Sequence, residues 1–203
     1  MTVAISSQAR RPAHRVARIA TEVFAPALLA AVMPIVVGTA SAPSIREGLP
    51  WALTGALFCA VIPNSLIWWG VRRGRLTDHH IRVREQRRTP LVYGLLSVIA
   101  GIALMVSFDA PRRLLAMVVV MLAIGVAVTV VNLFWKLSIH AAVAAGSAAV
   151  LVIEFGPTLL VSVPVVALVG WSRVRLGEHT TGQVLAGTIV GLLVAVPTFG
   201  LLR

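Results

Sequence analysis

Hydrophobic residues occur along this chain in long blocks rather than on one face of a helix or at alternate positions of a strand. A helix needs about 20 apolar residues to cross the hydrocarbon core of a bilayer, and somewhat fewer where it is tilted. The blocks therefore predict an all-α bundle of six or seven transmembrane helices, in a single integral membrane domain over residues 1–203. The expected spans lie near 22–42, 50–70, 91–108, 114–135, 137–154, 157–171 and 184–202.

The first block has two interpretations. A basic segment, 1–21, precedes an apolar stretch from Phe24 to Val37, and the following Ala40-Ser41-Ala42 resembles a signal-peptidase site. The block is therefore either a retained first span or a signal segment that is removed. The orientation of the later spans is the same in both cases.

Composition and charge agree with a membrane domain. The chain is 58% hydrophobic and 12% charged, whereas about 25% of a soluble domain is charged. Lys and Arg together number 18, against 7 acidic residues, and Lys136 is the only lysine. The basic residues lie between the hydrophobic blocks, which favours topology and anionic lipid headgroups over nucleic acid as the reason for the excess.

Most of these basic residues fall on one side of the predicted bundle. With the N-terminus inside, that side carries the segment 1–21 and an Arg-rich loop over 71–90. The positive-inside rule therefore predicts a multi-pass protein of the inner (plasma) membrane with a cytoplasmic N-terminus. The single cysteine, Cys59, excludes an internal disulfide.

Three polar segments lie at the inner ends of predicted spans, where the bundle can bring them together. They are Leu76 to Pro90 (LTDHHIRVREQRRTP), Trp135 to His140 (WKLSIH) and Ser172 to Gln183 (SRVRLGEHTTGQ). Arg and Lys side chains without an excess of carboxylates suit a phosphate group. Two histidines can divide phosphoryl transfer, one attacking phosphorus and the other protonating the leaving oxygen. Arg side chains can stabilise the phosphoryl oxygens, so no metal and no other cofactor is expected.

The third segment resembles the SRxxxxxHxxxD motif of the type 2 phosphatidic acid phosphatase superfamily, with Ser172, Arg173 and His179 at the matching positions. The second resembles a diverged PSGH motif of that superfamily, and RVREQRRTP loosely resembles its KxxxxxxRP motif. WKLSIH and RVRLGEHTTGQVLAG look closest to a small bacterial subgroup. The resemblance covers roughly residues 70–195.

The resemblance implies a helical bundle with a six-span core that hydrolyses a lipid phosphate or an isoprenoid (pyro)phosphate at the cytoplasmic face. It implies that His179 is the nucleophile, that His140 is the general acid and that Arg173 holds the phosphate. The other residues implied at the phosphate are Lys136, Ser138, Ser172, Arg84, Arg87 and Arg88.

One position departs from the motif. Gln183 stands where the family has the Asp that orients the nucleophilic histidine. A neutral amide can hydrogen-bond an imidazole but cannot offset the charge of an imidazolium, so hydrolysis is expected to be weakened. Glu178, beside His179, is a candidate substitute for the missing carboxylate.

Some of these residues also fit roles that involve no substrate. Lys136 beside Trp135 fits a side chain that reaches from the membrane boundary to water, and the Arg-rich loop fits orientation alone. Asp78-His79-His80 form a weak candidate for a metal site.

Two further functions stay open beside hydrolysis. A transferase or cyclase using a prenyl diphosphate would normally need Asp-rich magnesium motifs, and the only aspartates are Asp78 and Asp109. A non-catalytic protein that binds or transports lipid phosphates is the third candidate.

Overall fold

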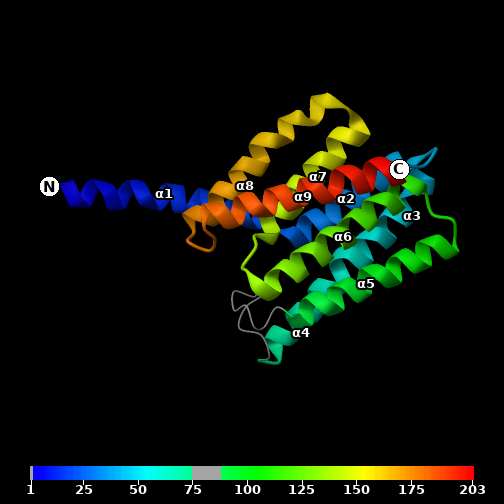
Figure 1. Ribbon diagram of the computed structural model, residues 1–203, viewed down its shortest axis with the longest axis horizontal. Helices are drawn as coiled ribbons and strands as arrows, with labels where there is room; N and C mark the ends of the chain where they lie inside the picture. Colours follow the sequence, from blue (N-terminus) through cyan, green and yellow to red (C-terminus); the bar gives the residue numbers. More distant parts are fainter. Residues whose placement is uncertain (1, 75–87) are drawn as a thin grey trace.

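The computed structural model describes the backbone of residues 2–74 and 88–203, and the side chains of residues 12–74 and 89–203. Over these residues the fold is an all-α bundle without strands, as the hydrophobic blocks predict (Figure 1). The α-helices are α1 (Thr2–Val23), α2 (Pro26–Ala40), α3 (Ile45–Ala56), α4 (Ile62–Arg72), α5 (Arg88–Ser107), α6 (Arg112–Phe134), α7 (Ile139–Phe155), α8 (Val163–Arg175) and α9 (Thr181–Leu202). A π-helical turn, Leu57–Val61, joins α3 to α4, and a 3₁₀ segment, Pro157–Ser162, leads into α8.

The helices confirm a multi-pass membrane protein. Five stretches of the described chain are long and apolar enough to span a bilayer: Ile45–Arg72, Thr89–Ser107, Arg112–Phe134, Pro157–Arg175 and Thr181–Leu202. A sixth forms if Pro12–Val23 and Pro26–Ala40, bent by 47° at their junction, count as one span. The span expected over 137–154 corresponds to α7, which is apolar but has only 17 residues.

Two expected spans are longer in the structure. The span expected over 50–70 begins at Ile45, because Ser44 caps α3 by accepting a hydrogen bond from the backbone of Glu47. The span expected over 157–171 extends to Arg175, because its 3₁₀ turn continues into α8 without a break. The joint at Phe24 and Ala25 precedes Pro26, which starts α2.

The short helix α7 lies at the centre of the bundle. Every residue from His140 to Val150 is buried, and α2, α6, α8 and α9 pack around the helix. Protein rather than lipid therefore covers most of α7. Its main core partners include Met33 and Val37 from α2 and Phe199 from α9, so the first hydrophobic block contributes directly to the core.

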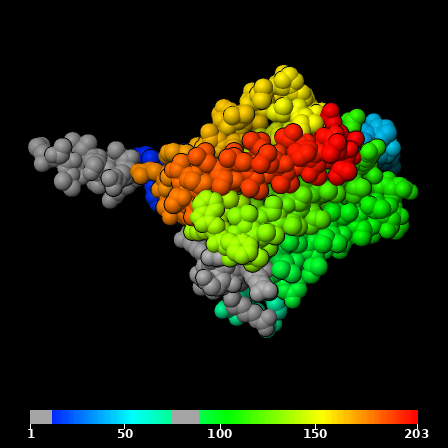
Figure 2. All heavy atoms as spheres, in the orientation of Figure 1, coloured from blue at the N-terminus to red at the C-terminus, as the bar shows by residue number. Residues whose placement is uncertain are grey.

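The outer helices carry exposed apolar side chains on the surfaces that face away from the centre of the bundle. Figure 2 shows α6 and α9 side by side across one face of the molecule. Exposed large apolar residues on these two helices include Val126, Val130, Leu133, Leu185, Ile189 and Leu193. A continuous apolar surface of this kind requires a membrane or another apolar partner.

Glycines allow α9 to approach α7 very closely. A Cβ atom on Gly191 would lie 2.2 Å from the carbonyl oxygen of Ala142, and one on Gly187 would lie 2.5 Å from that of Ser138. Gly146 of α7 makes a separate close approach to α6, where an added Cβ would lie 2.4 Å from the side chain of Ile124. Small residues spaced four apart are the usual means by which membrane helices bring their backbones together.

Replacing Gly191 tests this contact. Gly191→Ala is expected to lower the free energy of unfolding by about 1–3 kcal/mol, because the new methyl group overpacks the interface. Thermal unfolding in one uncharged detergent measures the effect. Gly200→Ala on the same helix is the matched control: a Cβ there meets nothing within 4 Å, so it should be neutral or slightly stabilising. Equal melting temperatures for the two variants would contradict this account of the packing.

Candidate functional site

The site is built at the end of the bundle where α6 and α8 finish and α7 and α9 begin, called here the site end. The turn between α8 and α9 positions its main residues. Gly177 adopts a positive φ of 70°, which ends α8 and reverses the chain. The carbonyl of Arg173 then accepts hydrogen bonds from the backbone N–H groups of Glu178, at 3.1 Å, and His179, at 3.3 Å. These bonds fix His179 next to Arg173.

The start of α9 holds the other side of the turn. Thr180 is its N-cap, and its hydroxyl accepts from the backbone N–H of Gln183 at 3.3 Å. In return, the side-chain oxygen of Gln183 accepts from the backbone N–H of Thr180 at 3.2 Å. This reciprocal capping box satisfies two backbone donors at the helix start. Gln183 therefore has a structural role at the start of α9 that involves no substrate.

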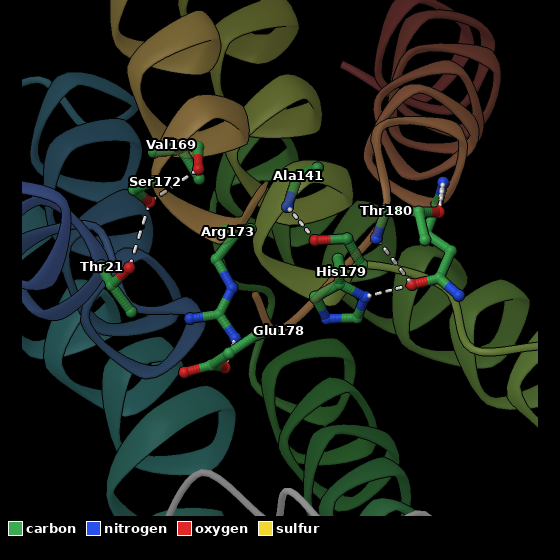
Figure 3. A network of polar contacts seen from close by, with 10 residues as sticks. Thr21, Ala141, Val169, Ser172, Arg173, Glu178, His179 and Thr180 are labelled. Carbon is green, nitrogen blue, oxygen red and sulfur yellow. Dashed lines mark hydrogen bonds and ion pairs between the residues drawn. The ribbon is translucent and has the colours of Figure 1, made fainter. Parts of the chain in front are cut away.

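The same amide oxygen determines the proton position on His179. Nδ1 of His179 lies 3.2 Å from Oε1 of Gln183, which the backbone of Thr180 identifies as an oxygen because an N–H donates only to an acceptor (Figure 3). An amide oxygen cannot donate, so Nδ1 must carry the proton in this bond. The neutral ring then has its lone pair on Nε2. Gln183 thus selects the tautomer in which Nε2 is unprotonated.

Arg173 lies deep in the site end. Its side chain is only 4% exposed, and its guanidinium forms an ion pair with the carboxylate of Glu178. Figure 3 shows Glu178 beside the guanidinium and the ring of His179 next to both. Glu178, the candidate substitute for the missing Asp, therefore pairs with Arg173. A hydrogen-bond partner of His179 is Gln183.

Ser172 faces away from this pair. Its hydroxyl donates to the carbonyl of Val169 at 2.7 Å and lies 3.0 Å from the hydroxyl of Thr21 on α1. Because the Ser172 proton is committed to Val169, Thr21 is the donor in the second bond. Ser172 thus joins α8 to α1 through a buried hydrogen bond, so its hydroxyl has a structural role between two helices.

Sequence reasoning missed the contribution of Thr21. The signal was present in the basic segment, because Ala17, Ala20 and Thr21 are small and spaced to share one helix face. All three are buried, and α1 packs against α8.

The start of α7 brings the second segment to the same place. Ser138 is the N-cap of α7 and is fully buried, and its hydroxyl accepts from the backbone of Ala141 at 3.4 Å. Its own N–H donates to the carbonyl of Gln183 at 3.3 Å. His140, buried in the first turn of α7, is two residues from this contact. Lys136 lies half-buried in the connection between α6 and α7.

The predicted first segment cannot be placed in the same way. Arg84 and Arg87 lie outside the described residues, as do Asp78, His79 and His80. Arg88 begins α5, and its side chain is not among those described. Within the described part of the chain, no group of three or more His, Cys, Asp or Glu side chains is arranged to hold a metal ion.

A second charged group lies at the opposite end of the bundle. Arg113 pairs with Glu154 at 3.1 Å, and here the carboxylate is the buried partner, with side-chain exposures of 57% and 3% respectively. These two residues and Arg203 line a polar cavity of about 350 Å³. The cavity is distant from the histidines, so it is not part of the candidate site.

No protein-family model, no curated protein and no solved structure matches the chain. The fold and the site together define a helical membrane protein with a buried arginine and a buried histidine in one turn at the end of its bundle.

The tautomer of His179 is directly testable. In the wild-type protein, ¹⁵N NMR of labelled histidine is expected to show Nδ1 protonated and Nε2 unprotonated at high pH. Gln183→Leu removes the acceptor, so the ring should shift toward a mixture of tautomers. Gln183→Glu keeps an acceptor oxygen and is the matched control. A tautomer ratio unchanged in Gln183→Leu would contradict the assigned role.

Proposed function

We propose that this protein is a membrane phosphatase-like enzyme that hydrolyses a lipid phosphate or an isoprenoid (pyro)phosphate through a phosphohistidine intermediate. The observation that carries the proposal is the turn that holds His179 beside the buried Arg173, with its Nδ1 3.2 Å from Oε1 of Gln183 so that Nε2 is the nitrogen left for attack. The resemblance of the second and third polar segments to the phosphatase motifs supports the same residues.

Arg173 suits the role of phosphate ligand. A guanidinium binds two phosphoryl oxygens through paired N–H groups, and its attraction for an anion is stronger where water is largely excluded. The N-termini of α7 and α9 both lie at the site end and add partial positive charge. Lys136 is close enough in sequence to Ser138 and His140 to contribute a further cation.

The reaction divides between the two histidines. Nε2 of His179 attacks phosphorus, the Nε2–P bond forms, and the bond from phosphorus to the lipid oxygen breaks. His140 gives its proton to that oxygen, which leaves as an alcohol or, from a diphosphate, as the monophosphate. Water then attacks the phosphohistidine, returns a proton to His140 and releases inorganic phosphate with His179 restored.

The position of the site relative to the membrane fits a lipid substrate. Exposed tryptophans gather at the site end: Trp68 and Trp69 near the end of α4, Trp135 after α6 and Trp171 on α8. Such residues mark the headgroup level of a bilayer. The positive-inside rule assigns this end to the cytoplasmic side of the inner (plasma) membrane, so the substrate would enter from the inner leaflet.

One observation favours a second function. Gln183 carries no charge, and its side chain has a structural role in the capping box of α9. A protein that binds lipid phosphates without hydrolysing them would use the same arginine and the same turn. The experiment below separates this alternative, and that of a prenyl-diphosphate transferase or cyclase, from a phosphatase.

The first test is phosphate release. Purified protein in detergent is given a panel of lipid and prenyl mono- and diphosphates without added metal. Turnover is expected in the wild type and should fall by at least about 10³-fold in His179→Ala, because the nucleophile is lost. His14→Ala, at an exposed position on α1, is the matched control and should keep full activity.

The failed outcomes are also informative. No turnover from a folded wild-type protein that still binds the panel would favour the binding function. Turnover that requires magnesium and survives in His179→Ala would favour the prenyl-diphosphate chemistry.

Restoring the carboxylate of the motif gives a second test. Gln183→Asp is expected to raise kcat by about tenfold or more, because a carboxylate offsets the positive charge that His179 carries during phosphoryl transfer. Gln183→Asn, which shortens the side chain equally but stays neutral, is the control and should not raise kcat. Equal rates for the two variants would show that charge at this position does not limit the reaction.

A further inference from the structure

The guanidinium proposed to bind phosphate already holds an anion of the protein itself. The carboxylate of Glu178 pairs with Arg173, and a carboxylate presents its oxygens to a guanidinium much as a phosphate does. A ligand that uses Arg173 must therefore displace Glu178 or share the guanidinium with it.

The two partners differ in their access to water. The side chain of Arg173 is 4% exposed and that of Glu178 is 19% exposed. A buried guanidinium without an anion is costly, whereas the more exposed carboxylate can move into water at lower cost. Glu178 is thus the partner that can leave, and Arg173 is the partner that stays.

Glu178 also competes at a high effective concentration. It follows Arg173 by five residues, and its backbone N–H donates to the carbonyl of Arg173 at 3.1 Å. Gly177, whose backbone has a positive φ of 70°, keeps this turn tight. A tethered competitor of this kind excludes ligands that bind the guanidinium no better than a carboxylate does.

We infer that Glu178 makes the Arg173 site selective for phosphomonoester ends, including the terminal phosphate of a diphosphate, over phosphodiesters. The inference rests on the proposed phosphate site. A phosphodiester carries one negative charge, so exchanging it for the carboxylate gains no charge, whereas a phosphomonoester carries nearly two. Most membrane phospholipids are phosphodiesters, and at the headgroup level they would otherwise compete for the guanidinium of Arg173. The carboxylate of Glu178 therefore outcompetes phosphodiesters at the guanidinium, and the more highly charged phosphomonoester displaces it.

Binding measurements test this without requiring turnover. Isothermal titration calorimetry of the full-length protein in an uncharged detergent, at about pH 8, compares inorganic phosphate with dimethyl phosphate. The wild type should bind inorganic phosphate at least about tenfold more tightly. In Glu178→Gln, the affinity for dimethyl phosphate should rise by about tenfold and the preference for inorganic phosphate should shrink, because the neutral amide no longer competes. Phosphatidic acid and phosphatidylglycerol in the same detergent form the lipid arm, which shows whether the preference also holds for a headgroup on a tail.

Controls keep the outcome unambiguous. Glu47→Gln removes the same charge from the exposed start of α3, where the carboxylate accepts a hydrogen bond from Ser44, and should leave both affinities unchanged. Glu178→Ala repeats the test if Glu178→Gln does not fold. An affinity for dimethyl phosphate that stays within about twofold of the wild-type value in the folded variant would overturn the inference. The two proposals can fail separately. Absence of phosphate release would count against hydrolysis but not against the selectivity assigned to Glu178. Phosphate release together with the same ligand preference in the wild type and in Glu178→Gln would count against that selectivity but not against hydrolysis.

Discussion

The close approach of α7 and α9 is the contact on which the site depends. At Gly187 and Gly191 the two backbones meet without intervening side chains, with Ser138 and Ala142 on the facing helix. Within a bilayer there is no hydrophobic force between helices, so close packing and backbone contact supply the association. At the site end this approach lets the N–H of Ser138 reach the carbonyl of Gln183. The segments that carry His140 and His179 therefore meet through a helix interface.

The turn between α8 and α9 uses the same groups for folding and for the proposed chemistry. The carbonyl of Arg173 accepts two backbone hydrogen bonds, and Gln183 both caps α9 and holds His179. An amide at this position satisfies the helix start and selects the tautomer, but it brings no charge. The same residue thus positions His179, the proposed nucleophile, without the electrostatic stabilisation that a carboxylate would supply.

The two ends of the bundle contain ion pairs of opposite design. At the site end the arginine is buried and the carboxylate is the more exposed partner, whereas at the other end Glu154 is buried and Arg113 is exposed. In a low-dielectric interior the buried partner is held in place, and the exposed one can exchange with groups from water. The site end is therefore suited to receive an anion, and the other end keeps its own carboxylate.

The sequence alone determined the helical membrane fold and the approximate spans, because long apolar blocks have one stable arrangement in a bilayer. Its resemblance to the phosphatase motifs also selected His140, Arg173, His179 and Gln183 as candidate site residues. Only the tertiary structure decided what these residues contact. Glu178 pairs with Arg173, and Ser172 bonds to Thr21, 151 positions earlier in the chain. Such contacts depend on which helix faces meet and on how one glycine directs a turn, and a pattern of apolar and polar positions does not specify either.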